Sequence, residues 1–535
     1  MAFTTIHGAT AADATSFIGS AGVDVIALNS VGTPVWLGAQ ASADQISFTS
    51  STRSATAYTI HGGQGNDRFS AGDERASLHQ SFVNLNRGND TISLSGAETS
   101  SILGGQGDDT LLLAGVIRNS HIQANQSNDQ LTLRSGASLI ASTINGNAGD
   151  DLISVEAISS FEASTLFGGQ GNDTINASTA SVGLVMQGDA GNDQLSGGSG
   201  IDTFLVNAGD DTITNLGQGG ADRISIAAGA AAFATVTVSW TATADVSNQG
   251  SGTLISGSPG VNINLELASG SRGWTLQDSS GDEVLFGSPQ QDTINASAGN
   301  DELRGRGGDD SISGGSGNDE IFSNEGNDWI EGGADNDIIN AGQGNDTVNG
   351  GLGNDRIVGG TTGRDQLNGG DGDDVITGYS EADTLSGGTG IDTFGNFESR
   401  FGESGSSVMA SGNTLTAGGI LAGDSITFAT DVAGNVDRVT DFSIGVDKLD
   451  VITAATAPTA LVGIGSGTAL TLGTTYVAYG TYDPGTGTFL IAGGYAAGTP
   501  DALVLIGNGT ETAITSTGYQ VLTGLGGALT AGDFI

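Results

Sequence analysis

The chain has 535 residues, of which 91 are glycine and none is cysteine, and its 60 acidic residues against 15 basic ones give a formal charge of −45. A hydrophobic content of 37% is too high for a disordered polyelectrolyte, so we expect an ordered but unusual scaffold. The charge excludes nucleic acid as a natural partner and favours metal cations. No run of 18 apolar residues occurs, so the sequence predicts no transmembrane segment.

Residues 1–224 contain aspartates that are followed two residues later by an apolar side chain, mostly in steps of 19 to 23 residues. These are Asp24, Asp44, Asp67, Asp90, Asp109, Asp129, Asp151, Asp173, Asp193, Asp202, Asp211 and Asp222. Seven residues before each of the first nine stands another apolar residue, so apolar positions nine apart flank each aspartate. We predict a β-solenoid with aspartate loops mainly on one edge and longer loops without metal, such as 72–81 and 157–164, on the other.

Residues 225–281 lack this spacing but contain alternating segments at 235–240 and 261–267, which predict strands. We interpret this stretch as a non-repeat β insertion that joins two coiled segments. The alternative is a lateral docking surface that exposes Trp240 or Trp274.

Residues 282–394 carry the clearest repeat. Aspartates recur at intervals of nine, with two steps of ten, at Asp282, Asp292, Asp301, Asp310, Asp319, Asp328, Asp337, Asp346, Asp355, Asp365, Asp374, Asp383 and Asp392. An apolar residue stands two positions after each of them. Glycines before the aspartate permit a tight loop, and the alternating residues after it favour a strand. Two such units predict one coil of about 18 residues in a parallel β-solenoid, with aspartate loops on both edges.

Residues 395–535 are rich in glycine and small residues but lose the period of nine, and we expect a C-terminal β cap domain. The predicted fold class is therefore all-β, a parallel β-roll or β-solenoid with a β insertion and this cap.

The hexamer Gly-Gly-x-Gly-x-Asp occurs unbroken at 62–67, 104–109, 168–173, 197–202, 314–319, 350–355, 369–374 and 387–392. This pattern resembles the calcium-binding nonapeptide repeat of the RTX exoproteins. The resemblance implies a calcium β-roll in which ions lie between loops of successive coils, bound by aspartate carboxylates and glycine carbonyls. The implied metal-binding residues are Asp67, Asp109, Asp151, Asp173, Asp193, Asp202, Asp211, Asp222, Asp301, Asp310, Asp319, Asp328, Asp337, Asp346, Asp355, Asp365, Asp374, Asp383 and Asp392, with Gly62, Gly104, Gly168, Gly197, Gly314, Gly350, Gly369 and Gly387.

Single loops of Gly, Asn and Asp are ordinary turns that need no metal. Stacked carboxylates about 5 Å apart, however, repel strongly unless cations lie between them. Counting the intervals between aspartates on one edge gives an upper bound of about 21 Ca²⁺ ions. The loops of Asp44, Asp129, Asp282 and Asp292 depart from the pattern, which leaves the sites beside them open.

The segment 436–450 resembles the stretch that follows the roll in RTX exoproteins, and the chain ends in Asp533, Phe534 and Ile535. This ending is similar to the uncleaved signal of type I secretion substrates. Residues 1–15 lack the basic and apolar pattern of a signal peptide. We therefore expect export by type I secretion machinery, without an N-terminal signal peptide, to the cell surface or the medium.

The only histidines are His7, His61, His79 and His121, and neither a zinc-protease motif nor a Gly-x-Ser-x-Gly elbow is present. We predict that the protein is not an enzyme. We expect a secreted structural protein that folds on Ca²⁺ and assembles with itself into a surface layer, sheath or filament, with cell-surface polysaccharide as a further candidate partner. The alternatives are an RTX adhesin or glycan-binding exoprotein, and a secreted hydrolase.

Overall fold

The computed structural model describes residues 42–48, 55–71, 78–379, 383–390 and 392–394, and outside these ranges it describes only short strands. It divides into two compact units, Met1–Trp274 (unit 1) and Thr275–Ile535 (unit 2). Each element in the described part of the chain is a β-strand. No helix there is long and apolar enough to cross a membrane. The prediction of an all-β parallel solenoid is confirmed.

Unit 1 coils between two parallel sheets, which we call sheet I and sheet II. The strands of sheet I are β1 (Thr5–Ile6), β3 (Val25–Leu28), β5 (Gln45–Phe48), β8 (Arg68–Ala71), β11 (Thr91–Glu98), β13 (Thr110–Arg118), β15 (Gln130–Leu133), β18 (Leu152–Val155), β21 (Thr174–Asn176), β23 (Gln194–Ser196), β25 (Asp210–Leu216), β27 (Ala231–Val236) and β30 (Ser251–Ser256). The short strands β6 (Ala55–Thr56), β9 (Leu78–His79), β16 (Ser138–Ile140) and β19 (Ser160–Glu162) lengthen it on one side.

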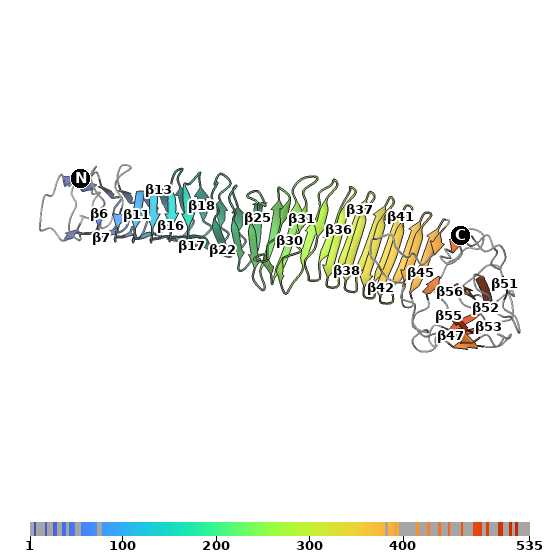
Figure 1. The fold of residues 1–535 in the computed structure, drawn as a ribbon. Helices are drawn as coiled ribbons and strands as arrows, with labels where there is room; N and C mark the ends of the chain where they lie inside the picture. Colours follow the sequence, from blue (N-terminus) through green and yellow to red (C-terminus); the bar gives the residue numbers. More distant parts are fainter. Residues whose placement is uncertain are drawn as a thin grey trace. The chain divides into compact units, whose positions relative to one another are not determined.

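Sheet II lies on the other side of the coil. Its strands are β2 (Ser16–Ile18), β4 (Val35–Gly38), β7 (Tyr58–His61), β10 (Phe82–Asn84), β12 (Ser101–Gln106), β14 (His121–Gln126), β17 (Thr143–Ala148), β20 (Thr165–Gln170), β22 (Val185–Ala190), β24 (Thr203–Val206), β26 (Arg223–Ile226), β29 (Ser247–Asn248) and β32 (Ser269–Gly270). Figure 1 shows these strands stacked one coil after another.

The core of unit 1 consists of apolar ladders in register. Ile102, Ile122, Ile144 and Leu166 of sheet II occupy equivalent positions in successive coils, and each is 0% exposed. These are the apolar positions seven residues before the aspartates. Because strand side chains alternate between the two faces, every second residue faces inward. Burial of each such side chain stabilises the coil by about 1.5–3 kcal/mol.

Residues 225–270 of unit 1, which we expected to interrupt the coil, instead continue it. Strand β27 pairs in parallel with β25 and β30, and β29 pairs in parallel with β26 and β32. Two further strands, β28 (Trp240–Thr241) and β31 (Ile263–Asn264), also pair in parallel.

The alternative of a docking surface with an exposed tryptophan is wrong. Trp240 and Trp274 are each 2% exposed. The indole Nε1 of Trp240 donates a hydrogen bond of 3.1 Å to the carbonyl oxygen of Asp222. A Cβ at Gly252 would collide with the Trp274 ring, so the glycine makes room for this large core residue. Both tryptophans are therefore core residues of the coil and not surface residues.

Unit 2 repeats a shorter coil of two strands. One sheet contains β33 (Trp274–Gln277), β35 (Thr293–Asn295), β37 (Ser311–Ser316), β39 (Trp329–Ala334), β41 (Thr347–Leu352), β43 (Gln366–Asp371) and β45 (Thr384–Thr389). The other contains β34 (Val284–Phe286), β36 (Glu302–Gly307), β38 (Glu320–Glu325), β40 (Ile338–Gln343), β42 (Arg356–Thr362), β44 (Val375–Tyr379) and β46 (Thr393–Phe394).

Paired residues in unit 2 are mostly 18 apart, as in Leu303 with Ile321. One irregularity lies in β42, where Gly342 pairs with Gly360 but Gln343 pairs with Thr362. The extra residue at 361 is a β-bulge, which accounts for the ten-residue step between Asp355 and Asp365.

Beyond residue 394 only short strands are described. They are β47 (Thr414–Thr416), β48 (Ser425–Thr427), β49 (Asp437–Val439), β50 (Lys448–Leu449), β51 (Val462–Gly463), β52 (Thr475–Asp483), β53 (Thr488–Ile491), β54 (Asp501–Ile506), β55 (Ala513–Thr515) and β56 (Tyr519–Leu522). Antiparallel pairs such as β52 with β54 contrast with the parallel coil before them. The expected secretion signal at residues 533–535 lies outside the described residues, as does Asp24.

Candidate metal centres

The loops that lead into the strands end in buried carboxylates that stack in columns. Within each column the main-chain N–H of one residue donates a hydrogen bond to Oδ1 of the aspartate one coil further on, as in Asp319 to Asp337 at 2.8 Å. The aspartates of these columns that are described here are 0–2% exposed. The Oδ1 atom of each carboxylate thus links one coil to the next.

Unit 1 has one long column, which precedes strands of sheet I. Its members are Asp44, Asp67, Asp90, Asp109, Asp129, Asp151, Asp173, Asp193 and Asp211. Asp44 and Asp129, whose loops depart from the repeat, occupy the same place as the others. On the opposite edge a short column begins at Asp202, which accepts from the N–H of Leu184, and continues to Asp222.

Unit 2 has a column on each edge. One contains Glu283, Asp301, Asp319, Asp337, Asp355, Asp374 and Asp392. The other contains Asp292, Asp310, Asp328, Asp346, Asp365 and Asp383.

The position of Asp282 was wrongly interpreted. It lies on the outside of its loop, where its Oδ1 accepts from the N–H of Asn300. Glu283 takes the column position instead and donates its main-chain N–H to Asp301 at 2.7 Å. The core residue two positions further is then Leu285, which is 0% exposed. The step from 283 to 292 is nine, so the apparent step of ten disappears.

A second ladder runs along the outer side of the loops, one residue before each column aspartate. Here the N–H of Asn318 donates to Oδ1 of Asn300, and the N–H of Asn336 donates to Oδ1 of Asn318, at 2.9 and 3.0 Å. In unit 1 the N–H of Asn89 donates to Asn66 in the same way. These Asn and Asp side chains brace the loop from outside and leave the column carboxylate facing inward.

The second oxygen of many column aspartates is buried without a hydrogen-bond partner. This holds for Oδ2 of Asp67, Asp90, Asp109, Asp129, Asp151, Asp173, Asp301, Asp310, Asp319, Asp337, Asp346, Asp355 and Asp374. Burying a carboxylate oxygen without a partner costs free energy of folding. A bound proton or cation at each of these atoms would remove that cost.

A glycine five residues before the aspartate shapes the space at Oδ2. A Cβ built at Gly332 would lie 2.5 Å from Oδ2 of Asp337 and 2.6 Å from the carbonyl oxygen of Gly350 in the next coil. Gly62, Gly104, Gly168, Gly197, Gly314, Gly350, Gly369 and Gly387 all face the Oδ2 of their own loop's aspartate in this way. Some loops carry a Cβ at this position, such as Ala296 before Asp301 and Ala341 before Asp346.

The pKa values of the buried carboxyl groups also indicate that each needs a proton or a cation. Burial raises the pKa of the Asp90 carboxyl to about 8 and that of Asp337 to about 8, although main-chain hydrogen bonds lower both. Burial likewise raises the pKa of Asp310 to about 9, and the neighbouring carboxylates of Asp292 and Asp328 add to the effect. Without a positive charge nearby, these groups favour the neutral form at neutral pH.

The donor set fits a hard divalent cation. Carboxylate and main-chain carbonyl oxygens converge on the cradle, and Ca²⁺ prefers several oxygen ligands of these kinds. The fit is poorest at three positions, where Oδ2 already accepts a hydrogen bond. Asp202 accepts from the N–H of Gly198, Asp222 from the N–H of Gly217, and Asp292 from the N–H and hydroxyl of Ser288.

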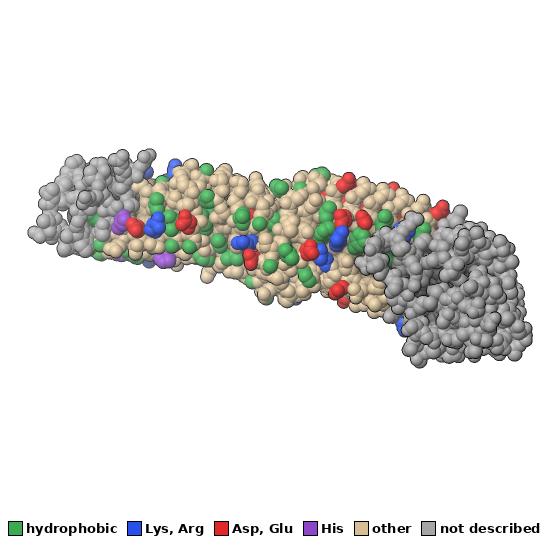
Figure 2. Space-filling view, in the orientation of Figure 1, with side chains coloured by type: hydrophobic (Ala, Val, Ile, Leu, Met, Phe, Trp, Pro, Cys, Tyr) green, Lys and Arg blue, Asp and Glu red, His purple; other side chains and the backbone are tan. Residues whose placement is uncertain are grey.

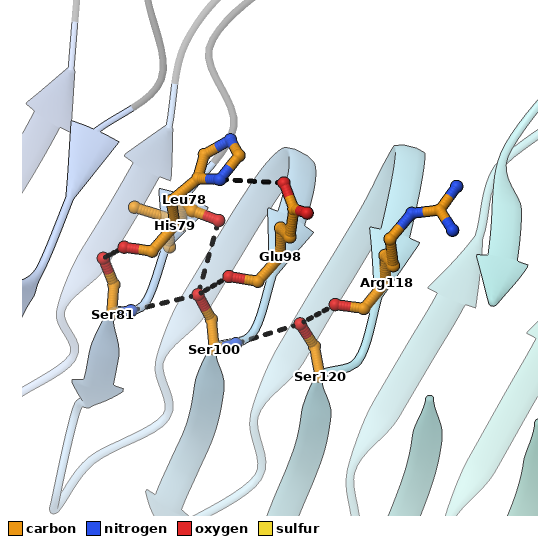
Figure 3. Close-up of polar contacts among 7 residues, drawn as sticks. All are labelled: Leu78, His79, Ser81, Glu98, Ser100, Arg118 and Ser120. Carbon is orange, nitrogen blue, oxygen red and sulfur yellow. Dashed lines mark hydrogen bonds and ion pairs between the residues drawn. The ribbon is translucent and has the colours of Figure 1, made fainter. Parts of the chain in front are cut away.

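The edge of unit 1 opposite the long column carries serines at the equivalent position. The N–H of Ser81 donates to Oγ of Ser100, and the N–H of Ser100 donates to Oγ of Ser120, each at 3.1 Å (Figure 3). Ser142 and Ser164 continue this serine column. Each hydroxyl also donates to the carbonyl oxygen two residues earlier, so both of its roles are satisfied without charge.

On the serine edge, residues 72–77 of the expected loop 72–81 lie outside the described residues. The residues before the serines, Gln80, Thr99, Asn119, Ala141 and Ala163, have φ between 47° and 53°. Each turn before a serine thus contains one residue in the left-handed conformation. On the outer side, His79 Nδ1 and Glu98 Oε2 lie 2.8 Å apart (Figure 3). Part of the expected loop 157–164 is strand β19, which extends sheet I.

Comparison with protein families gives one match, to the RTX calcium-binding nonapeptide repeat (4 copies). The matched residues are 59–75, 141–157, 162–179, 187–224, 277–312, 286–321, 322–357 and 359–394. The chain is an RTX-family repeat protein. Comparison with curated proteins finds no match.

RTX repeats imply a calcium-binding, secreted protein. The aspartate columns extend beyond the matched stretches of this RTX protein, because Asp90, Asp109 and Asp129 lie between them and have the same geometry. The sequence did not predict the serine column or the place of Glu283 in the carboxylate column. A strict 18-residue register from Leu303 back to Leu285 would have identified Glu283.

Proposed function

We propose that this RTX protein is a secreted structural protein that folds on Ca²⁺ outside the cell and then assembles with itself into a surface layer, sheath or filament. In the proposed cycle, the chain leaves the cell unfolded through type I secretion machinery. Calcium outside the cell then binds the column carboxylates of the repeats and fixes the coil. The proposal assigns the chain no catalytic role.

The observation that carries calcium-driven folding is the set of buried Oδ2 atoms without partners. Such a column cannot be both ionised and buried at neutral pH unless cations enter it. Figure 2 agrees with this arrangement, since on the face in view isolated acidic side chains (red) are separated by broad uncharged areas (tan). A chain with 60 acidic residues has therefore turned many of its carboxylates inward.

Self-assembly is supported by exposed apolar residues in coils that lack column aspartates. Phe233, Val238 and Leu267 are 47%, 49% and 59% exposed. Large apolar side chains this exposed favour burial against another molecule. A second copy of this chain is the partner we propose, because column carboxylates engaged with ions offer little to a neighbour.

The test uses full-length protein, folded with Ca²⁺ and followed by light scattering and electron microscopy. We expect ordered sheets or filaments. The triple variant Phe233→Ser, Val238→Thr, Leu267→Gln should bind calcium and fold, yet remain monomeric. A control with Val116→Thr and Leu152→Gln, which changes residues 48% and 38% exposed elsewhere, should assemble like the wild type.

Protein that folds on calcium but stays monomeric at high concentration and on cells would contradict the assembly role. In that case binding to a cell-surface glycan would support the adhesin alternative. Protein that binds no calcium would overturn the whole proposal.

A further inference from the structure

One loop of unit 2 breaks the repeat at two positions at once. In most loops of unit 2 a glycine stands five residues before the column aspartate, and the remaining aspartate loops hold a small residue there, as at Ala296, Ser323 and Ala341. Before Glu283 this position holds Asp278. The column residue is also longer by one methylene, since it is glutamate. The side chain of Asp278 therefore stands where most loops have none. The column residue that it faces is glutamate instead of aspartate.

These changes bring three carboxylates together. Single carboxylate oxygens of Asp278, Glu283 and Asp301 lie within 4.8 Å of one another. The three side chains are 8%, 1% and 2% exposed. Oxygen atoms at this separation can all contact one Ca²⁺, whose ligand distances are about 2.3–2.6 Å.

Two of the three groups present a free, buried oxygen. Oδ1 of Asp301 accepts the main-chain N–H of Glu283, and Oδ1 of Asp278 accepts the main-chain N–H of Ser279. Oδ2 of both aspartates is buried and has no hydrogen-bond partner. The first oxygens thus fix the carboxyl groups, and the second oxygens remain for a ligand.

The cluster is held rigidly by the coil. The main-chain N–H of Asp278 donates to the carbonyl oxygen of Asn295, and the Ser297 hydroxyl donates to the carbonyl oxygen of Asp278. Asp301 in turn donates its N–H to Asp319. A rigid, buried site with more negative charge binds Ca²⁺ more tightly, because charge count and rigidity set calcium affinity.

We propose that Asp278, Glu283 and Asp301 form a three-carboxylate cation site that binds Ca²⁺ more tightly than the glycine-lined sites of the columns. The proposal rests on the proposed calcium-binding function, and it adds an individual site at which loading of unit 2 begins. Its distinguishing residue is Asp278, because the other two occupy ordinary column positions.

The test counts bound calcium on full-length protein equilibrated in graded calcium buffers, by elemental analysis. Wild type should retain one ion per chain at a free calcium concentration about ten-fold below that which fills the other sites. Asp278→Gly, which restores the residue of the regular loops, should lose this tight ion and keep the rest. Asp278→Asn should do the same while keeping the side-chain volume, in case the glycine variant misfolds.

Asp337→Asn is the matched control, since Asp337 is a column aspartate with a regular glycine cradle. It should keep the tight ion and lose weaker binding. A second readout is the luminescence lifetime of Tb³⁺ in H₂O and D₂O, which reports coordinated water. The first Tb³⁺ bound should carry fewer waters than later ones, and Asp278→Asn should add about one water to it.

Identical calcium isotherms for wild type and both Asp278 variants would overturn this site while leaving the proposed function intact. Loss of the tight ion in Asp337→Asn but not in the Asp278 variants would also overturn it. Absence of calcium binding in every protein would overturn both proposals.

Discussion

Asp90 and Asp109 are joined by a hydrogen bond of 2.7 Å from the main-chain N–H of Asp90 to Oδ1 of Asp109. The other oxygen of Asp109, Oδ2, is buried and accepts no hydrogen bond. Oδ1 of Asp109 therefore links two coils through a hydrogen bond, whereas Oδ2 needs a cation or a proton as its partner. The occupant of that second oxygen sets the stability of the coil.

In the absence of metal, the coil should be more stable in acid than at neutral pH. Burial raises the pKa of Asp90 to about 8 and that of Asp310 to about 9, from an ordinary value of 3.8. The folded state then binds protons more tightly than the unfolded chain, so this contribution is complete below pH 3.8 and is lost as the pH rises through about 8 to 9. Circular dichroism and denaturant unfolding of metal-stripped protein across this range provide the measurement.

Calcium should abolish this dependence at neutral pH, because the cation replaces the proton. The acid effect should persist in high salt, which screens surface repulsion but reaches buried groups poorly. Metal-free protein that is more stable at pH 8 than at pH 4 would contradict the argument.

Gly332→Ala should damage a metal centre. The new Cβ would lie 2.5 Å from Oδ2 of Asp337 and 2.6 Å from the Gly350 carbonyl oxygen, so atoms must move. We expect a loss of about 1–3 kcal/mol in the free energy of unfolding and a lower calcium count. The control is Gly307→Ala, whose Cβ would have its nearest neighbour at 3.7 Å and should change little. Equal calcium counts in the two variants would refute the cradle.

Ser100→Ala should weaken unit 1 without changing its calcium content. The Ser100 hydroxyl accepts the buried N–H of Ser81 at 3.1 Å and donates to the Glu98 carbonyl oxygen at 3.0 Å. Its removal leaves a buried N–H unsatisfied, at a cost of about 1–3 kcal/mol. Ser101→Ala, at the next residue, is the control. Thermal unfolding and elemental analysis give the two readouts, and a change in the calcium count would speak against a metal-free edge.

Thr99→Gly should stabilise the protein. Thr99 is exposed and has a φ of 53°, in the left-handed region that a β-branched residue adopts at a cost. Glycine should relieve about 1 kcal/mol of this strain. Ser101→Gly, at an ordinary strand position, should instead cost about 0.5–1 kcal/mol. Denaturant midpoints compare the two, and destabilisation by Thr99→Gly would show that the side chain contributes more than the backbone strain.

Calcium-loaded crystals should show ions in one row along the long column of unit 1 and in two rows in unit 2. The serine column from Ser81 to Ser164 should hold none, because its hydroxyls are satisfied. Anomalous scattering locates the ions directly. Ions beside the serines would contradict the division between the two edges.

The coil of unit 2 could be predicted from sequence because each coil repeats the same contacts, so a period of nine in Asp and Ile reports register directly. The rule failed at Asp282 because Val284 meets the requirement for an apolar residue two positions later by coincidence. The buried residue is Leu285, and the structure aligns it with Leu303.

Two further features left too weak a signal. Serine is common throughout the chain, and the serines of the column are separated by 19, 20, 22 and 22 residues, so no fixed period marks them. In 225–270 the coil continues with tryptophan in its core, and the large ring of Trp274 needs Gly252 in the preceding strand. A pattern of small and large partners of this kind is visible only when the strands are paired.

The two ladders of each loop run in opposite directions along the stack. In the inner ladder Asp319 donates forward to Asp337, whereas in the outer ladder Asn336 donates back to Asn318. A cut between two coils would therefore leave unlike surfaces, with inner amide donors and outer amide acceptors on one side and the reverse on the other. The coil has a head and a tail, and two copies can continue each other's ladders only when joined head to tail.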